Sequence, residues 1–129
     1  MAMDSFTRVL IVEDERLVAR DLERRLRRLG YMVVALVSTG IEAIDQALEH
    51  QPDLVLMDIR LRGQMDGIEA VASIRKHLNV RVVYMSAYID EATLARAQAT
   101  QPDAFLPKPF SNNSFQEMLQ QVLPLLFCK

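Results

Sequence analysis

Short apolar runs alternate with longer amphipathic segments along most of the chain. The apolar runs lie at residues 9–12, 31–37, 54–57, 80–85 and 104–106, and most are rich in valine, leucine and isoleucine. A short, uninterrupted apolar run bounded by polar or turn-forming residues is typical of a strand that is buried on both faces. The pattern therefore predicts five strands.

The segments that follow these runs have the periodicity of amphipathic helices. In the first of them, Val18, Leu22, Leu26 and Leu29 recur on one helical face. The expected helices cover residues 16–29, 41–49, 68–78, 91–99 and 111–123. In the last helix the inward residues would be Phe115, Met118, Leu119 and Val122. Each predicted strand is thus followed by a predicted helix.

Capping residues mark several of the expected helix ends. Thr39 precedes Glu42, and Asp66 precedes Glu69, by the three residues of a capping box. Asp90 suits the N-cap of the fourth helix, and Gly30 suits the C-terminal cap of the first. These residues predict helix boundaries independently of the apolar periodicity.

Strands that alternate with helices predict an α/β fold, in which helices cover both faces of a parallel sheet. Right-handed crossovers leave few arrangements of such strands. The fifth strand is short and runs into Pro107, which suits the edge of a sheet. We therefore expect a doubly wound (βα)5 three-layer sandwich that forms a single domain over residues 7–125, with no output domain in the chain.

Composition restricts the class of protein further. Half of the 129 residues are hydrophobic and a quarter are charged, which suits one domain with a substantial core. The net charge of -2 disfavours a nucleic-acid binder. The one cysteine, Cys128, cannot form an internal disulfide, and neither a signal peptide nor a run of about 20 apolar residues is visible. We expect a cytoplasmic domain that neither binds DNA directly nor enters a membrane.

The C-terminal segment 123–127 is apolar and contains Pro124, which should end or kink the last helix. Three roles stay open for the apolar residues after it. The first role is that these residues fold back onto the core, the second is that they form an interface, and the third is that they mark the cut from a longer protein.

Polar residues follow the predicted strands at the points where the strands end. Glu13 and Asp14 follow the first strand, Asp58 the third and Ser86 the fourth, and Lys108 comes just after the fifth. In an open parallel sheet, ligands bind outside the carboxyl ends of the strands, near the switch in strand order. We therefore expect these side chains to gather at one rim of the sheet.

Three carboxylates at one rim need a counter-charge. They are tolerated when a cation lies among them or when their pKa values separate. Oxygen ligands suit Mg²⁺, for which Mn²⁺ can substitute, and the lack of cysteine and histidine near the rim disfavours zinc and copper. A carboxylate nucleophile, a metal ion, a lysine and a hydroxyl together suit phosphoryl transfer onto the carboxylate.

These motifs resemble those of response-regulator receiver domains, the chemotaxis-receiver-like family of two-component systems. The resemblance covers about residues 8–123 and is carried by five segments in family-like order and spacing. The segments are residues 9–15, 54–59, 65–69, 85–88 and 106–110. Each is a weak signal alone, but the ordered set is specific. The resemblance implies a flavodoxin-like sheet with strand order 2-1-3-4-5.

The resemblance implies which residues hold the phosphoryl group and the metal. Asp58 would be the phosphoacceptor. Asp14 and Asp58 would bind Mg²⁺ directly, Glu13 would bind it directly or through water, and the main-chain carbonyl of Arg60 would be a further ligand. The acidic rim would thus be both the metal site and the site of modification.

The resemblance also implies a switch. Ser86 would hydrogen-bond the phosphoryl group after transfer, and Lys108 would pair with one of its oxygens. Phe105 stands at the position of the switch aromatic residue and would turn inward as Ser86 moves. The Lys108-Pro109 peptide bond would be cis, a conformation that X-Pro bonds adopt at low cost.

The chain departs from the common family pattern at several positions. Glu13 stands where aspartate is usual, and Ser86 stands where threonine is frequent. The loop 58–66 is one residue longer than in the chemotaxis receiver and lacks its usual proline. Arg60 and Tyr88 occupy positions that tune the lifetime of the phosphoryl group in the family.

The function that the resemblance implies is a phosphorylation switch. A sensor histidine kinase or a phosphotransfer protein would donate a phosphoryl group from phosphohistidine to Asp58. The domain would also help to hydrolyse the product, so it would be a signalling phosphoacceptor and not a conventional enzyme. Phosphorylation would shift the surface of helix four, strand five and helix five, through which a homodimer could form. The chain would be a stand-alone receiver or the receiver part of a larger regulator or hybrid kinase.

The same sequence also bears on three alternative functions. A pseudo-receiver would be an interaction module that never gains phosphate, and the complete set of acids and lysine disfavours it. A flavin or nucleotide binder would need a G-x-G or P-loop pattern, which glycines 30, 40, 63 and 67 do not form. A haloacid-type phosphatase would need an acid two residues after Asp58, where Arg60 stands.

The first helix is rich in arginine, and our interpretation is a solvated face on which Asp21 and Glu23 are partial partners. The sharper alternative is a docking face for an acidic partner, because receivers meet their kinases beside this helix. The arginines are Arg16, Arg20, Arg24, Arg25, Arg27 and Arg28. We interpret His50 and His77, each near a helix C-terminus, as structural.

Overall fold

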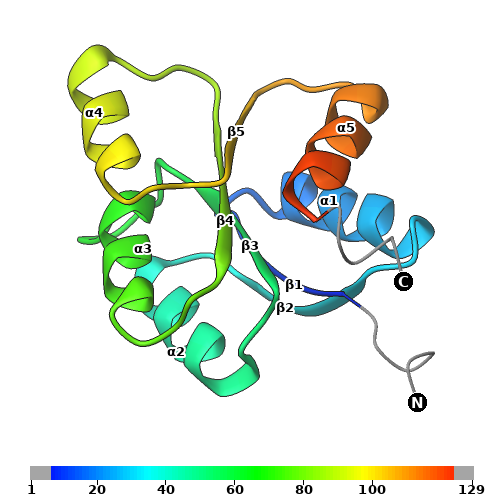
Figure 1. The fold of residues 1–129 in the computed structure, drawn as a ribbon, viewed down its shortest axis with the longest axis horizontal. Helices are drawn as coiled ribbons and strands as arrows, with labels where there is room; N and C mark the ends of the chain where they lie inside the picture. The colour runs from blue at the N-terminus through cyan, green and yellow to red at the C-terminus, as the bar shows by residue number, and fades with distance from the viewer. Residues whose placement is uncertain (1–6, 124–129) are drawn as a thin grey trace.

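The computed structural model describes residues 7–123, and its strands and helices alternate strictly along the chain (Figure 1). The strands are β1 (Arg8–Val12), β2 (Met32–Val37), β3 (Leu54–Asp58), β4 (Arg81–Ser86) and β5 (Ala104–Pro107). The helices are α1 (Arg16–Arg28), α2 (Gly40–His50), α3 (Gly67–Arg75), α4 (Glu91–Ala99) and α5 (Asn112–Val122). The predicted alternation is confirmed.

The strands form one parallel sheet in the order β2-β1-β3-β4-β5. This confirms the predicted order and the position of β5 at an edge. In the register of the central strands, Val12 lies beside Met57, and Asp58 lies beside Met85. The carboxyl ends of β1, β3 and β4 therefore reach the same edge of the sheet.

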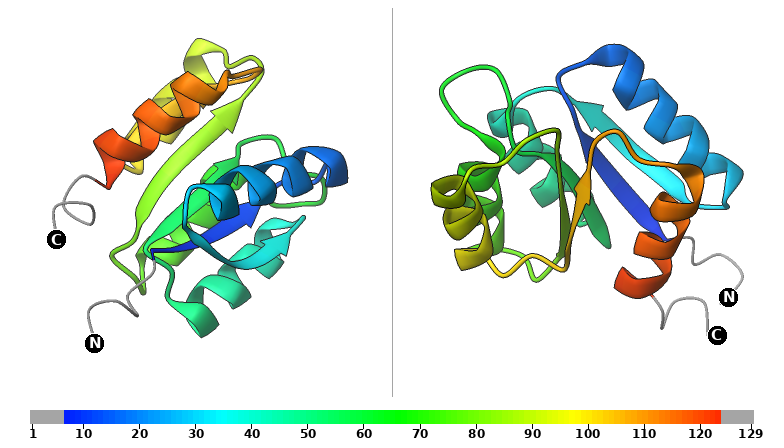
Figure 2. Two further views of the ribbon diagram at one scale, coloured as in Figure 1. Left: turned by 90° about the vertical axis from the view of Figure 1, so that its right-hand side faces the viewer. Right: turned by 90° about the horizontal axis from the view of Figure 1, so that it is seen from above.

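Helices cover both faces of the sheet, so the molecule has three layers (Figure 2). Residues of β1 alternate between two cores. Val9 and Ile11 pack in the core shared with α1 and α5, whereas Leu10 and Val12 pack in the core shared with α2, α3 and α4. Because successive side chains of a strand point to opposite faces, a strand between two helical layers must be apolar at every position. This is why the strands appeared as uninterrupted apolar runs.

The helix caps mostly follow the sequence prediction. Asp66 and Glu69 form a complete capping box at α3, and the Asp90 side chain accepts a hydrogen bond from the Thr93 N–H at α4. At α2 only half of the predicted box forms. The Thr39 hydroxyl accepts from the Glu42 N–H, but the Glu42 carboxylate accepts from Ser38 in place of the Thr39 N–H.

Three predicted helices were too long at their C-terminal ends, and in α5 the difference is the single residue Leu123, which is the C-cap. Leu29 was expected on the inward face of the first helix, but it is the C-cap of α1 and 38% exposed. The third helix ends at Arg75 and not at Leu78, because Lys76 is its C-cap. The apolar tail after Leu123 lies outside the described residues. Within residues 7–123, no helix has the length and apolarity needed to cross a membrane.

Candidate functional site

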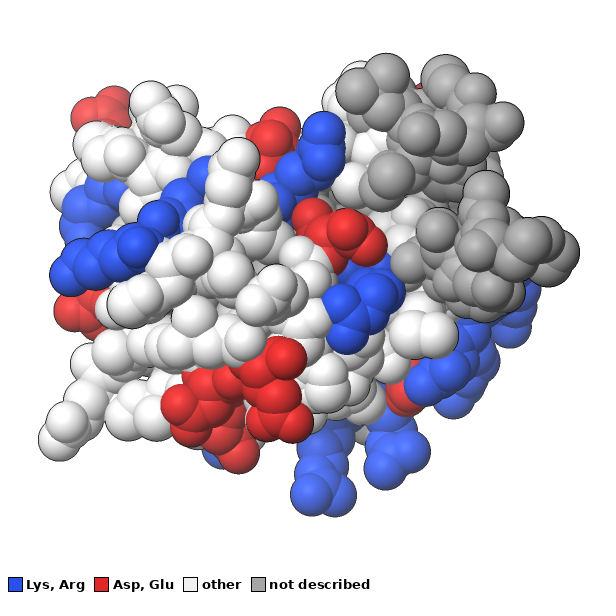
Figure 3. Space-filling view, turned by 60° about the horizontal axis from the view of Figure 1, so that its bottom comes forward, with Lys and Arg blue, Asp and Glu red and all other residues white. Residues whose placement is uncertain are grey.

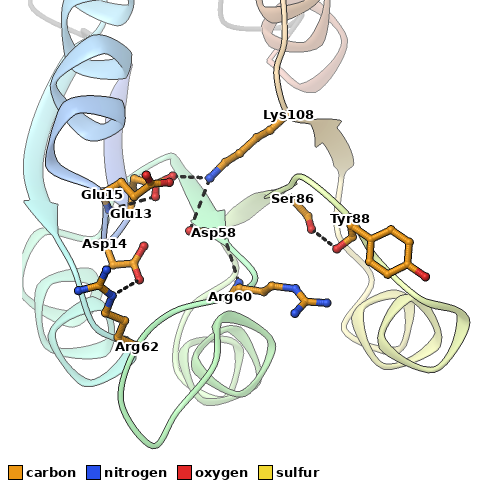
Figure 4. Close-up of polar contacts among 9 residues, drawn as sticks. All are labelled: Glu13, Asp14, Glu15, Asp58, Arg60, Arg62, Ser86, Tyr88 and Lys108. Atoms are coloured by element: carbon orange, nitrogen blue, oxygen red, sulfur yellow. Dashed lines mark hydrogen bonds and ion pairs between the residues drawn. The ribbon is translucent and has the colours of Figure 1, made fainter.

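Three carboxylates lie together beyond the carboxyl ends of β1 and β3 (Figure 4). Glu13 and Asp14 directly follow β1, and Asp58 is the last residue of β3. Each offers an oxygen, and these oxygens all lie within 4.8 Å of one another. The sheet register brings the two strand ends together. The prediction that these acids lie close to one another is therefore confirmed.

Two of these acids are deeply buried. Glu13 is 2% exposed and Asp58 is 6% exposed. Burial raises the pKa of Asp58 to about 7, and the negative charge of Glu13 adds to the rise. The charge of Lys108 and a hydrogen bond from the Arg60 N–H act in the opposite direction. The site thus holds a carboxyl group whose ionisation depends on a nearby positive charge.

Lys108 supplies one positive charge from the loop after β5. Its Nζ donates a 2.7 Å hydrogen bond to Glu13 Oε1 and lies 3.5 Å from Asp58 Oδ2. Burial would lower the pKa of Lys108, but the hydrogen bond to Glu13 and the charges of Asp58 and Glu13 outweigh it and raise the pKa. Lys108 is therefore an ammonium held between two carboxylates. The peptide bond to Pro109 is cis, as predicted.

A second cation, which sequence reasoning missed, lies beside Asp14. Arg62 Nε is 3.5 Å from Asp14 Oδ2, and the Arg62 side chain is largely exposed. Arg62 belongs to the loop between β3 and α3, which has no periodic pattern from which its direction could be predicted. One half-buried ammonium and one exposed guanidinium compensate three carboxylates only in part.

The donor set of this cluster fits a hard divalent cation. Its ligand atoms are carboxylate oxygens, and the Asp14 side chain is 13% exposed, so one side of the cluster is open to water. Mg²⁺ prefers oxygen ligands and retains several waters. The Arg60 N–H donates to Asp58 Oδ1 at 3.3 Å, which places the backbone of Arg60 at the site. The metal-binding role of the Arg60 carbonyl, which belongs to the next peptide group, stays a prediction.

The two predicted switch residues lie on the neighbouring strands. Ser86 is the last residue of β4, and its hydroxyl donates a 2.8 Å hydrogen bond to the carbonyl of Tyr88 (Figure 4). Phe105 on β5 is 36% exposed, with its ring 5.7 Å from that of Tyr84. A mostly apolar hollow of about 420 Å³ lies between these residues. The inward movement of Phe105 stays a prediction.

Gly67 brings α3 close to the acceptor strand. A Cβ atom at this position would lie 2.2 Å from the carbonyl oxygen of Asp58. The Gly67 N–H donates to the carbonyl of Ile59 at 2.9 Å. The Asp66-Gly67 pair of the motif therefore has two structural roles, since Asp66 caps the helix and Gly67 permits its close approach to Asp58.

The arginines of α1 are partly paired, as the solvated-face interpretation expected. Arg25 contacts Asp21 and Arg27 contacts Glu23, each pair at 2.9 Å. Figure 3 shows Lys and Arg side chains gathered at the lower right, on the side of the molecule that carries α1. Arg25 also lies over the ring of Phe110, a contact that the sequence did not predict.

Comparisons with known proteins support the family resemblance. The family model described as "Response regulator receiver domain" matches residues 9–120. The transcriptional regulatory protein PdtaR of Mycobacterium tuberculosis is 39% identical over 104 residues, which are 81% of this chain and 50% of PdtaR. The phyllosphere-induced regulator PhyR of Methylorubrum extorquens is 33% identical over 124 residues, 95% of this chain and 46% of PhyR. The chain thus spans about half the length of these relatives.

A solved structure extends the agreement to three dimensions. The receiver domain of a sensor histidine kinase from Pseudomonas aeruginosa PAO1 superposes with a TM-score of 0.83 and 31% sequence identity. The match covers 93% of this chain and 99% of that one. That structure has a magnesium ion coordinated in its active-site cleft. The similar fold and the acidic cluster of this chain are consistent with a site for the same ion.

Proposed function

The chain belongs to the family of response regulator receiver domains, and from this premise we propose that it accepts a phosphoryl group on Asp58 in a Mg²⁺-dependent reaction. Receiver domains are signalling phosphoacceptors of two-component systems, and their general partners are histidine kinases or phosphotransfer proteins. The donor would be a phosphohistidine of such a partner. We also propose that residues 7–125 form one domain and that this domain is located in the cytoplasm.

The position of Asp58 carries the proposal. Its carboxylate lies at the end of a central strand, 3.5 Å from the ammonium of Lys108 and beside two further acids. In the transfer, an Asp58 oxygen attacks phosphorus, and the bond from phosphorus to the donor's imidazole nitrogen breaks with its electron pair staying on nitrogen. Lys108 lies where it can stabilise negative charge on the transferring group.

Metal binding would fall to the acidic rim. Asp14, Asp58, Glu13 and the main-chain carbonyl of Arg60 are the proposed ligands of Mg²⁺, and Mn²⁺ would substitute. When bound, the ion supplies charge neutralisation for the incoming phosphoryl oxygens. All five residues of β3 are buried, and this burial holds Asp58, the last of them, in place.

After transfer, the switch residues would respond to the new charge. Ser86 would release the carbonyl of Tyr88 and donate to a phosphoryl oxygen, and Lys108 would pair with another. Phe105 would then turn into the adjacent hollow and alter the surface of α4, β5 and α5, through which the domain would signal or form a homodimer. Slow self-catalysed hydrolysis of the acyl phosphate would reset the switch.

Treatment with acetyl phosphate tests the proposal without a partner protein. With Mg²⁺ we expect one phosphoryl group per chain by intact mass, and we expect none for Asp58→Asn or after chelation of the metal. Asp45→Asn, which changes an exposed acid on α2, is the matched control and should label like the wild type. Labelling that survives in Asp58→Asn would move the acceptor elsewhere. A wild type that never labels would favour a phosphorylation-independent interaction module.

A further inference from the structure

Two arginines of α1 form the same pair with an acid four residues earlier but differ in one contact. Arg25 Nε donates to Asp21 at 2.9 Å, and Arg27 Nη2 donates to Glu23 at 2.9 Å. Only Arg25 lies over an aromatic ring, with its Cζ 5.2 Å from the centroid of Phe110. Arg25 is also the more buried of the two, with 25% of its side chain exposed against 57% for Arg27.

Phe110 connects this arginine to the lysine of the site. It is two residues after Lys108, its ring stacks on Phe115 of α5 at 5.5 Å, and it packs against the core between α1 and α5. The other end of the segment is held by β4, because the Lys108 N–H donates to the carbonyl of Ser86 at 2.9 Å. Residues 108–110 are thus held by β4 at Lys108 and by the core at Phe110, and Arg25 contacts Phe110.

We propose that Arg25 is a positioning residue for Lys108, and that it acts through the ring of Phe110. This inference rests on the proposed function and adds a residue to it. The Lys108 ammonium must remain near Glu13 and Asp58 at the end of a flexible side chain. A guanidinium over the ring of Phe110, a ring that also stacks on Phe115, restricts the backbone from which that side chain extends.

The charge of Arg25 explains why the contact is favourable. Among the described residues, Arg25 Nη1 is buried without a hydrogen-bond partner, so Asp21 satisfies only part of the guanidinium. The electron-rich face of an aromatic ring attracts a partly desolvated cation, and a planar guanidinium also stacks on it. A groove of about 390 Å³ runs beside this contact, lined by Val18, Arg25, Lys108 and Phe110 among others.

The matched variants Arg25→Gln and Arg27→Gln test the proposal, because both remove one ion pair from the same helix. With acetyl phosphate and Mg²⁺, we expect Arg25→Gln to slow the labelling of Asp58 about threefold to fivefold, whereas Arg27→Gln labels like the wild type. Arg25→Lys, which keeps the cation, should restore part of the rate. In a Lys108→Ala background, Arg25→Gln should have no further effect.

A second measurement does not depend on phosphorylation. In metal-free protein, the side-chain NMR signals of Lys108 should shift in Arg25→Gln and in Phe110→Leu and stay in place in Arg27→Gln. Equal slowing by the two glutamine variants, or an undiminished effect of Arg25→Gln without Lys108, would overturn the inference. Unmoved Lys108 signals in a folded Arg25→Gln would overturn it as well. A wild type that does not label would contradict the proposed function alone, and the NMR comparison would still decide the role of Arg25.

Discussion

The ammonium of Lys108 donates its 2.7 Å hydrogen bond to Glu13, a residue 95 positions earlier in the chain. Asp58, at 3.5 Å, is the more distant of its two acidic neighbours. Glu13 is buried and Lys108 is its ion-pair partner, so the contact joins the end of β1 to the loop after β5. Phosphorylation of Asp58 would therefore make Lys108 divide its hydrogen bonds between Glu13 and a phosphoryl oxygen.

Removal of this ammonium should separate labelling from switching. We expect Lys108→Ala to accept phosphate on Asp58 more slowly, because the nucleophile and the proposed metal ligands remain, but to lose the surface response. The measurement is intact mass for labelling, together with NMR shifts over α4, β5 and α5 with and without acetyl phosphate. Lys76→Ala, at an exposed position after α3, is the control. A complete surface response in Lys108→Ala would contradict the assigned role.

The acidic cluster should destabilise the metal-free fold at neutral pH. Asp58 has a pKa of about 7 in the fold, raised from 3.8 by burial and by Glu13. At pH values between these two pKa values, the Asp58 carboxyl is largely ionised in the unfolded chain but largely protonated in the fold. The free energy of unfolding therefore falls as the pH rises from about 4 to 7. Below about pH 4 Asp58 is protonated in both the folded and the unfolded state, so this loss of stability is absent there.

Asp58→Asn should therefore be more stable than the wild type at pH 8 without metal, by a margin on the order of a few kcal/mol. The margin should shrink towards pH 4. Mg²⁺ should also reduce it, because an ion that binds only the folded wild type stabilises that state. Urea unfolding at the two pH values, with and without Mg²⁺, measures each effect. A margin that does not change with pH would show that the ionisation of Asp58 is not its source.

Gly67 and Gly40 are both the first residue of a helix, and they should respond differently to an added methyl group. In Gly67→Ala the new Cβ would meet the Asp58 carbonyl oxygen at 2.2 Å, so either α3 or the end of β3 must move. We expect a loss of about 2–3 kcal/mol in the free energy of unfolding and slower labelling of Asp58. The assays are urea unfolding and acetyl phosphate labelling.

Gly40→Ala is the control for this prediction. Its Cβ would first meet the Cγ and Sδ atoms of Met65, each at 2.9 Å, and that flexible side chain can move aside. We expect a change within about 1 kcal/mol and normal labelling. Equal losses from the two substitutions would mean that the contact between α3 and β3 is not what requires glycine.

Particular residues show why much of this structure could be predicted from sequence. Val9 and Leu10 pack on opposite faces of one strand, and burial on both faces is visible as an uninterrupted apolar run. Asp14 and Asp58 converge because each lies at the carboxyl end of a parallel strand. Periodicity and strand ends are local properties of the sequence, so the sheet and the acidic rim followed from them.

The remaining contacts depend on where long side chains settle. The sequence predicted Lys108 at the acidic rim but not that its hydrogen bond goes to Glu13, and it gave no signal for the contact of Arg62 with Asp14. Both side chains reach their partners from loops through rotatable bonds. The contact of Arg25 with Phe110 joins residues far apart in the chain and was equally hidden. Tyr84 did give a signal, since a tyrosine within a buried strand needs a partner for its hydroxyl.

That partner is Thr100, and the contact should anchor the C-terminal end of α4 to the sheet. The Thr100 hydroxyl donates to the carbonyl of Ala97 at 2.6 Å, so the Tyr84 hydroxyl is the donor in its 2.7 Å hydrogen bond to Thr100. Tyr84→Phe should lower the free energy of unfolding by about 1 kcal/mol and speed amide exchange in α4. Tyr88→Phe, at an exposed ring, is the control and should change neither quantity. If Tyr84→Phe costs as much in a Thr100→Val background as in the wild type, the hydroxyl acts through another group.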